Sequence, residues 1–161
     1  MKNSLMLRLT INLLILFFGI SGCTGSKPEA QKSACEKKDY DCRIAENTQL
    51  IAQNPRDEDA YAERGVAYHF KKQYDEAIAD YTKALELNPE FANTYNNRAF
   101  SYEGKRDYDK ALADYNKAIE LRPNDADYHN SRGLLHQKRG EKSLAAADLN
   151  KAQELKKLKE K

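Results

Sequence analysis

The sequence repeats itself every 34 residues, and this period constrains the fold more than any other feature. The segment from Tyr74 to Pro89, YDEAIADYTKALELNP, recurs from Tyr108 to Pro123 as YDKALADYNKAIELRP. A third copy, KSLAAADLNKAQEL from Lys142, keeps the Ala, Asp, Lys, Ala, Glu and Leu positions. Such a period indicates stacked supersecondary units, each of which buries the hydrophobic face of its neighbour.

A shorter shared segment precedes each copy and contains one small residue. These segments are YAERGVAY, YNNRAFSY and HNSRGLLH, which begin at Tyr61, Tyr95 and His129. The longer segment carries two alanines seven residues apart, which would share one face of a helix, and a bulky residue lies between them. In the first two copies a proline then ends the helix. We therefore predict two helices per repeat that meet at small residues: Gly65, Ala99 and Gly133 on the first helix, and Ala77, Ala84, Ala111, Ala118, Ala145 and Ala152 on the second, with Tyr81, Tyr115 and Leu149 between the alanines.

The order of these positions resembles the tetratricopeptide repeat, which has this length and the same succession of Gly/Ala, Tyr, Ala, aromatic, Ala and Pro positions. Trp is absent, and Tyr61, Tyr95 and His129 occupy the position where that family often has Trp. The resemblance implies an all-α fold, a right-handed superhelix of three helix-turn-helix repeats. The repeats would cover residues 58–91, 92–125 and 126–159.

Residues 39–57 are in phase with the repeats and look like a degenerate second helix of an earlier one. Cys42 stands where the first repeat has Glu, and Arg43 and Asn47 replace the packing Ala and Tyr. We interpret this half-repeat as a capping helix that shields the first repeat, as terminal units of solenoids do. At the other end, residues 160–161 form only the end of a basic tail, and we expect no separate cap helix there.

An arginine in each first segment stands sixteen residues before an aspartate in the second. This spacing predicts an ion pair between the two helices of a repeat, and we favour that structural role over a functional one. The pairs are Arg64 with Asp80, Arg98 with Asp114, and Arg132 with Asp148.

The first 22 residues have the features of a targeting segment. Lys2 and Arg8 begin it, and an apolar run of about a dozen residues follows, shorter than the roughly 20 that span a bilayer as a helix. The run ends in ISGC, residues 20–23, which resembles the bacterial lipobox. The resemblance implies that residues 1–22 are cleaved and that Cys23 carries a diacylglycerol on its sulfur. The alternatives are an ordinary secretory peptide, or an uncleaved anchor with a coincidental Cys.

A lipid on Cys23 would place the chain in the cell envelope, because two or three acyl chains give stable membrane attachment. Thr24 follows the cysteine, where an Asp would be the inner-membrane retention signal of enteric bacteria. The resemblance therefore favours the outer membrane, facing the periplasm, for a Gram-negative source.

Residues 23–38 are mostly small and polar, so they cannot bury enough surface to fold, and we predict a flexible tether. Cys35 and Cys42 lie seven residues apart. In an oxidising compartment such a pair indicates a disulfide. A redox site has less support, because the spacing is not Cys-x-x-Cys.

The resemblance also implies a concave groove lined by the first helix of each repeat. Val66, Phe100 and Leu134 would form an apolar stripe along its centre, flanked by Asn96 and Asn130. Apolar anchors with neighbouring amides suit an extended peptide or a partner helix. The alternative is that the stripe packs within the superhelix or against a cap. The remaining groove candidates are Asp59, Ala62, His69, Asn93, Glu103, Asp127 and Gln137.

No motif predicts catalysis. A Gly-rich phosphate loop and a Gly-x-Ser-x-Gly motif are absent, and His69, His129 and His136 have no partners at metal-ligand spacing. The net charge of +2, from 27 Lys and Arg against 25 Asp and Glu, does not predict nucleic-acid binding. The mean hydropathy of −0.87 excludes a polytopic membrane protein. We expect neither an enzyme nor a cofactor, metal or nucleic-acid site.

The charge is distributed unevenly along the chain. Both excess positive charges lie in the segment expected to be cleaved. The three repeats carry 4 Lys and Arg against 8 Asp and Glu, then 6 against 6, then 8 against 4, which gives net charges of −4, 0 and +4. This gradient is either a field that orients a partner or a neutral property of a solvated solenoid.

Together these features predict a noncatalytic, lipid-anchored repeat protein that recruits another envelope protein or peptide. The alternative is a permanent structural or chaperone component, similar to a pilotin, of a pilus, secretion or other envelope assembly. The identity of the partner and the oligomeric state do not follow from the sequence.

Overall fold

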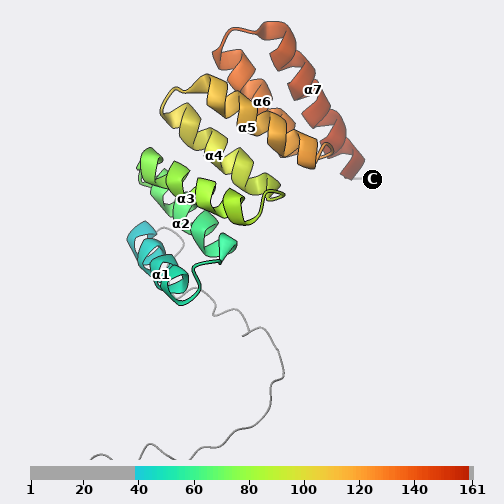
Figure 1. Cartoon of the computed structure of the whole chain (residues 1–161). Helices are drawn as coiled ribbons and strands as arrows, with labels where there is room; N and C mark the ends of the chain where they lie inside the picture. Colours follow the sequence, from blue (N-terminus) through green and yellow to red (C-terminus); the bar gives the residue numbers. More distant parts are fainter. Residues whose placement is uncertain (1–38, 160–161) are drawn as a thin grey trace, which may run out of the picture. The chain divides into compact units, whose positions relative to one another are not determined.

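The computed structural model of the chain describes residues 39–159, and within this range it is entirely helical. The predicted all-α repeat fold is confirmed. Figure 1 shows the helices following one another in chain order, each beside the next. The seven helices are α1 (Tyr40–Gln53), α2 (Glu58–Phe70), α3 (Tyr74–Leu87), α4 (Ala92–Gly104), α5 (Tyr108–Leu121), α6 (Ala126–Lys138) and α7 (Lys142–Lys159).

Local sequence signals set where several helices begin and end. Asp39, Asp57 and Asp107 precede α1, α2 and α5, and each side chain accepts a hydrogen bond from a backbone N–H three residues later. This satisfies one of the free N–H groups at a helix start. The helices α3 and α5 end at Leu87 and Leu121, two residues before a proline in each case, as predicted.

The turn between the two helices of each repeat requires a left-handed backbone. Gly140 adopts a φ of 78° in the third repeat, where glycine has no steric penalty. The equivalent residues Lys72 and Arg106 adopt φ angles of 62° and 63°, which L-residues with a side chain rarely do. The first two repeats therefore hold this turn at an energetic cost.

Small residues and rings fill the space between paired helices. Tyr81 and Tyr115 are almost fully buried. A Cβ atom on Gly65 would lie 2.8 Å from Cε1 of Tyr81, too close for any larger residue without a shift. Gly133 meets Leu149 in the same way, at 3.0 Å. The predicted contact between the small position and the bulky residue is confirmed in these two repeats.

The repeats are joined by further apolar contacts. Leu135 of α6 belongs to the same buried cluster as Tyr115 of α5, and Leu112 packs against this cluster. Tyr128 of α6 packs with Ala92 and Ala118 of the preceding repeat. Each repeat thus covers the hydrophobic face of the one before it, as stacked units must.

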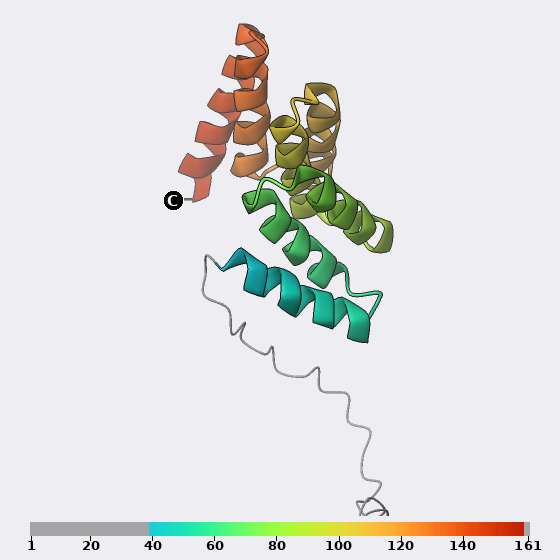
Figure 2. The same cartoon turned by 90° about the vertical axis from the view of Figure 1, so that its left-hand side faces the viewer.

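The predicted capping helix is present as α1, which packs on α2 (Figure 2). Tyr40 of α1 stacks on Phe70 of α2, with ring centroids 5.1 Å apart and planes 9° from parallel. Cys42, in the first turn of α1, is disulfide-bonded. Cys35 lies outside the described residues, so the Cys35–Cys42 pairing stays a prediction.

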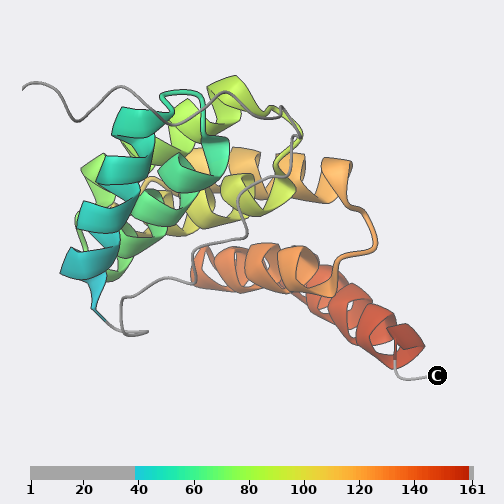
Figure 3. The ribbon, with the colours of Figure 1, turned by 90° about the horizontal axis from the view of Figure 1, so that it is seen from below.

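The other end of the array consists of α6 and α7, which pack side by side (Figure 3). The signal segment 1–22, Cys23, the tether 23–38 and the tail 160–161 lie outside the described residues. Among residues 39–159, no helix has both the length and the apolar character needed to cross a bilayer.

Candidate functional site

The apolar residues predicted to line the groove are open to solvent on two of the three first helices. Phe100 of α4 and Leu134 of α6 are 39% and 43% exposed, and Val66 of α2 is half-buried. They occupy the same position in successive repeats. Side-chain hydrogen bonds connect these helices in order, since His69 contacts Ser101 and a lysine of α6 contacts α4. The three residues therefore form a row across α2, α4 and α6, which we call the apolar row.

The Phe100 ring packs against a buried tyrosine. It meets the Tyr115 ring edge-on, with centroids 5.6 Å apart. The Tyr115 hydroxyl donates to Oε1 of Glu103 at 2.5 Å, and Lys138 donates to Oε2 at 2.5 Å. Burial and the hydrogen bond to Glu103 raise the pKa of Tyr115 well above its ordinary value, so the phenol keeps its proton and remains a donor.

The asparagine side chains near the apolar row differ in their hydrogen bonding. The side-chain Oδ1 of Asn93 accepts a hydrogen bond from the Tyr128 hydroxyl. Oδ1 of Asn96 is buried and has no hydrogen-bond partner. A buried acceptor in this state costs about 1–3 kcal/mol. The half-buried Asn130 lies at the equivalent position of the next repeat.

Some of the predicted groove residues are largely buried and expose little surface to a partner. Ala62 is only 7% exposed, and the Glu103 side chain is also 7% exposed, with both oxygens bonded within the chain. His69 Nδ1 lies 2.9 Å from Ser101 Oγ, and burial lowers the pKa of its imidazole, which favours the neutral form. The exposed candidates are Asp59, Asn93, Asp127 and Gln137.

One exposed aromatic residue was not among the predicted groove residues. Phe70 is 59% exposed and follows Val66 by one helical turn, so the two share a face of α2. The other repeats have Gly104 and Lys138 at this position. In the sequence, Phe70 stands out only because the equivalent residues of the other repeats are not aromatic. This difference could have identified it.

The three predicted arginine–aspartate ion pairs between helices are confirmed. Each guanidinium makes two hydrogen bonds to its aspartate, at 2.7–2.8 Å, and a third to a polar side chain sixteen residues earlier, on the preceding helix. They join Arg64 to Asp80 and Thr48, Arg98 to Asp114 and Thr82, and Arg132 to Asp148 and Asn116. These arginines are therefore engaged within the fold.

The histidines also have partners within the chain. His129 Nε2 lies 2.9 Å from the Pro123 carbonyl oxygen, and His136 Nδ1 lies 2.5 Å from Glu141. Across the described part of the chain, no group of three His, Cys, Asp or Glu residues is arranged to hold a metal ion.

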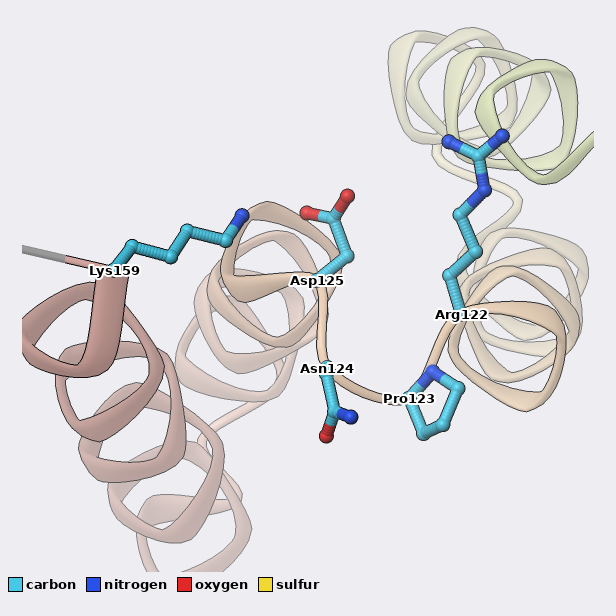
Figure 4. A pocket seen from close by; sticks show the side chains of 5 residues that line it. All are labelled: Arg122, Pro123, Asn124, Asp125 and Lys159. Carbon is cyan, nitrogen blue, oxygen red and sulfur yellow. The ribbon is translucent and has the colours of Figure 1, made fainter.

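A hollow of about 340 Å³ lies at the turn between α5 and α6 (Figure 4). Arg122, Pro123, Asn124, Asp125 and Lys159 line it. The Asp125 carboxylate already accepts the Asp127 N–H at the start of α6. This hollow has one engaged carboxylate and two cationic side chains, and none of the residues of the apolar row lines it.

Comparison with known families identifies the repeats. Three tetratricopeptide repeat models match, over residues 58–91, 80–113 and 106–140. The first match has the same bounds as the first predicted repeat. Together the matches span residues 58–140, which is more than half of the 161-residue chain.

Solved structures show the same fold. A crystal structure of MamA matches with a TM-score of 0.70 and 24% identity, over 74% of this chain and 70% of that one. MamA from Desulfovibrio magneticus RS-1, from residue 41 onward, matches with a TM-score of 0.71 and 22% identity, over 76% and 70%. None of the curated proteins has a significant match to the sequence. The chain belongs to the tetratricopeptide repeat proteins, and its repeats form a scaffold for protein–protein interaction.

Proposed function

We propose that the chain is a noncatalytic adaptor that binds a segment of a partner protein along the apolar row. The exposure of Phe100 and Leu134 at the same position of neighbouring repeats carries this proposal. Large apolar side chains that recur on one surface and stay exposed to solvent indicate an interaction site. Tyr115 holds the Phe100 ring in place, so the surface is preorganised and loses less entropy on binding.

The proposal also places the adaptor in the bacterial cell envelope, attached through a lipid on Cys23. The basic start, the apolar run and the ISGC motif support this part. Its test is metabolic labelling with a radioactive fatty acid. Label that disappears in Cys23→Ser and is unaffected in Cys35→Ser would support the anchor, whereas unlabelled wild-type protein would contradict it.

The binding proposal is tested by crosslinking in envelopes, followed by purification of the chain and its partners. We expect Phe100→Ala and Leu134→Ala to lose the partners that wild type recovers. Leu144→Ala is the matched control, because Leu144 of α7 is 52% exposed and lies outside the apolar row. Equal recovery by all variants would exclude the row as the binding surface. A single partner recovered at constant stoichiometry would favour the permanent structural component over the transient adaptor.

A further inference from the structure

Resting on the lipid anchor of the proposed function, we propose that the last turn of α7 docks on the surface of an anionic bilayer. This turn consists of residues 156–159, with the sequence KKLK, and we call it the basic end. A lipid on Cys23 would hold the chain beside a membrane, which gives the bilayer a high effective concentration at the basic end. The docking surface is separate from the apolar row, which lies on α2, α4 and α6.

The basic end exists because α7 continues past the point where α3 and α5 stop. Those helices end at Leu87 and Leu121, and the equivalent residue of α7 is Leu155. A proline stands two residues later in each of the first two repeats, whereas Lys157 takes that position in the third. Without a proline to stop it, α7 runs on to Lys159 and adds one turn beyond the repeat.

The added turn combines positive charge with one apolar side chain. All four of its residues are exposed, and Leu158 is 67% exposed, the largest fraction among the exposed large apolar residues of the described chain. At the equivalent position the first two repeats have the polar residues Glu90 and Asn124. The helix dipole favours lysines in a last turn, but it gives no reason for an exposed leucine among them.

The lysines of the basic end are available to an outside partner. Lys157 and Lys159 have no ion-pair partner among residues 39–159. Lys156 is held loosely, because its Nζ lies 3.9 Å from Oδ1 of Asp127 and its side chain is 55% exposed. Three ammonium groups can therefore contact anionic headgroups without first breaking a close ion pair.

A second element adds to this cationic surface. Arg122 is exposed at the turn between α5 and α6 and lines the same hollow as Lys159 (Figure 4). Asp125, in the same hollow, caps α6. Counting Asp127 as well, the end of the third repeat has four cations against two carboxylates, a net charge of +2. The equivalent positions of the second and first repeats carry 0 and −2, so only the third repeat has a cationic end.

The leucine favours a bilayer over other anionic surfaces. A nucleic-acid backbone offers phosphates alone, whereas a bilayer has an apolar layer directly below its headgroups. Leu158 can enter the boundary between these layers while the flanking lysines keep their ammonium groups at the phosphates. No helix among residues 39–159 is long and apolar enough to cross a bilayer, so the contact is one of docking on the surface.

The absence of tryptophan from the chain provides the test. Leu158→Trp places a single indole at the basic end. Leu144→Trp is the matched control, because Leu144 is also exposed on α7 but lies about 21 Å away along the helix axis. Each full-chain variant is purified from bacterial membranes and reconstituted in vesicles of phosphatidylcholine alone, or of equal parts phosphatidylcholine and phosphatidylglycerol.

We expect the Leu158→Trp emission to shift to shorter wavelength in the anionic vesicles alone, and brominated acyl chains to quench it there. The Leu144→Trp emission should be the same in both vesicles. Adding Lys157→Gln/Lys159→Gln to Leu158→Trp should abolish the shift, as should about 1 M salt, where charges act over only about 3 Å. Lys142→Gln/Lys151→Gln removes two exposed lysines elsewhere on α7 and should leave the shift intact.

Flotation of the vesicles measures the anchor separately. Wild-type chain that floats with both vesicles, with a Leu158→Trp emission that is the same in both, would overturn this inference and leave the anchor standing. Flotation with the anionic vesicles alone, together with the shift, would overturn the anchor and support the docking. A shift produced by double-stranded DNA and not by anionic vesicles would assign the basic end to nucleic acid and overturn the inference.

Discussion

Arg98 holds Asp114 in a two-point ion pair, with Nε to Oδ2 and Nη2 to Oδ1 both at 2.8 Å. The remaining Nη1 donates to Thr82 Oγ1 on the preceding repeat at 3.0 Å. One side chain thus links α4 to its own partner helix α5 and to α3. The same arrangement occurs in all three repeats, so each arginine joins three successive helices.

We expect Asp114→Ala to lower the free energy of unfolding by about 3 kcal/mol, because it leaves a largely buried guanidinium without its counter-charge. Urea denaturation would measure this. The matched control is Glu120→Ala, which breaks an exposed pair with Lys117 and should cost less than about 1 kcal/mol. A loss no greater than the control's would show that the pair adds little to stability.

The arginine–aspartate pairs could be predicted from the sequence. The two helices of each repeat have a constant length, so residues sixteen positions apart in the sequence come close together. The same reasoning could have found Thr48, Thr82 and Asn116, which stand sixteen residues before each arginine, but their identities vary and hide the pattern. Repeat register predicted the apolar row, yet it could not predict burial at each position. Ala62 and Glu103 illustrate this, since both are largely buried, and Glu103 is bonded to Tyr115 and Lys138 within the chain.

Lys72→Gly should stabilise the first repeat. The native φ of 62° at this position is strained for a residue with a Cβ and costs about 1 kcal/mol. Glycine relieves this strain, but it also gives the unfolded chain more freedom. We therefore expect a net gain of roughly 0.5 kcal/mol in urea denaturation. Gly140→Ala should change stability in the opposite direction, and a destabilised Lys72→Gly would contradict the strain argument.

Stability should decrease in mildly acidic solution in a way that depends on His69. Burial lowers the pKa of its imidazole below the ordinary value of 6.5. Below pH 6.5 the unfolded chain therefore binds a proton that the folded chain binds only at lower pH. The contribution of His69 to stability is complete above this value and is lost as pH falls through the folded pKa.

The measurement is urea denaturation across a pH series, with wild type compared to His69→Asn. The variant should lose less stability than wild type between neutral and mildly acidic pH. Parallel curves would show that His69 does not contribute, and that the pH dependence comes from groups elsewhere in the chain.

The outer face of α7 should prevent further stacking of repeats. Leu112 and Ile119 of α5 pack against core clusters that include Leu135 and Tyr128 of the next repeat. The equivalent residues of α7 are Ala146 and Gln153, both exposed. Terminal repeats need a polar outer face of this kind to stay soluble. The change Ala146→Leu/Gln153→Leu gives the outer face of α7 the apolar pattern of an internal repeat.

We expect that double variant to self-associate with increasing concentration in sedimentation velocity, because a second chain can cover the new apolar face. Ala147→Leu/Glu154→Leu is the matched control. It adds two leucines with the same spacing on α7, but at positions whose counterparts Ala113 and Glu120 are exposed in α5. Association of both variants would indicate nonspecific hydrophobicity. Association of the first alone would show that Ala146 and Gln153 keep the outer face of α7 from associating.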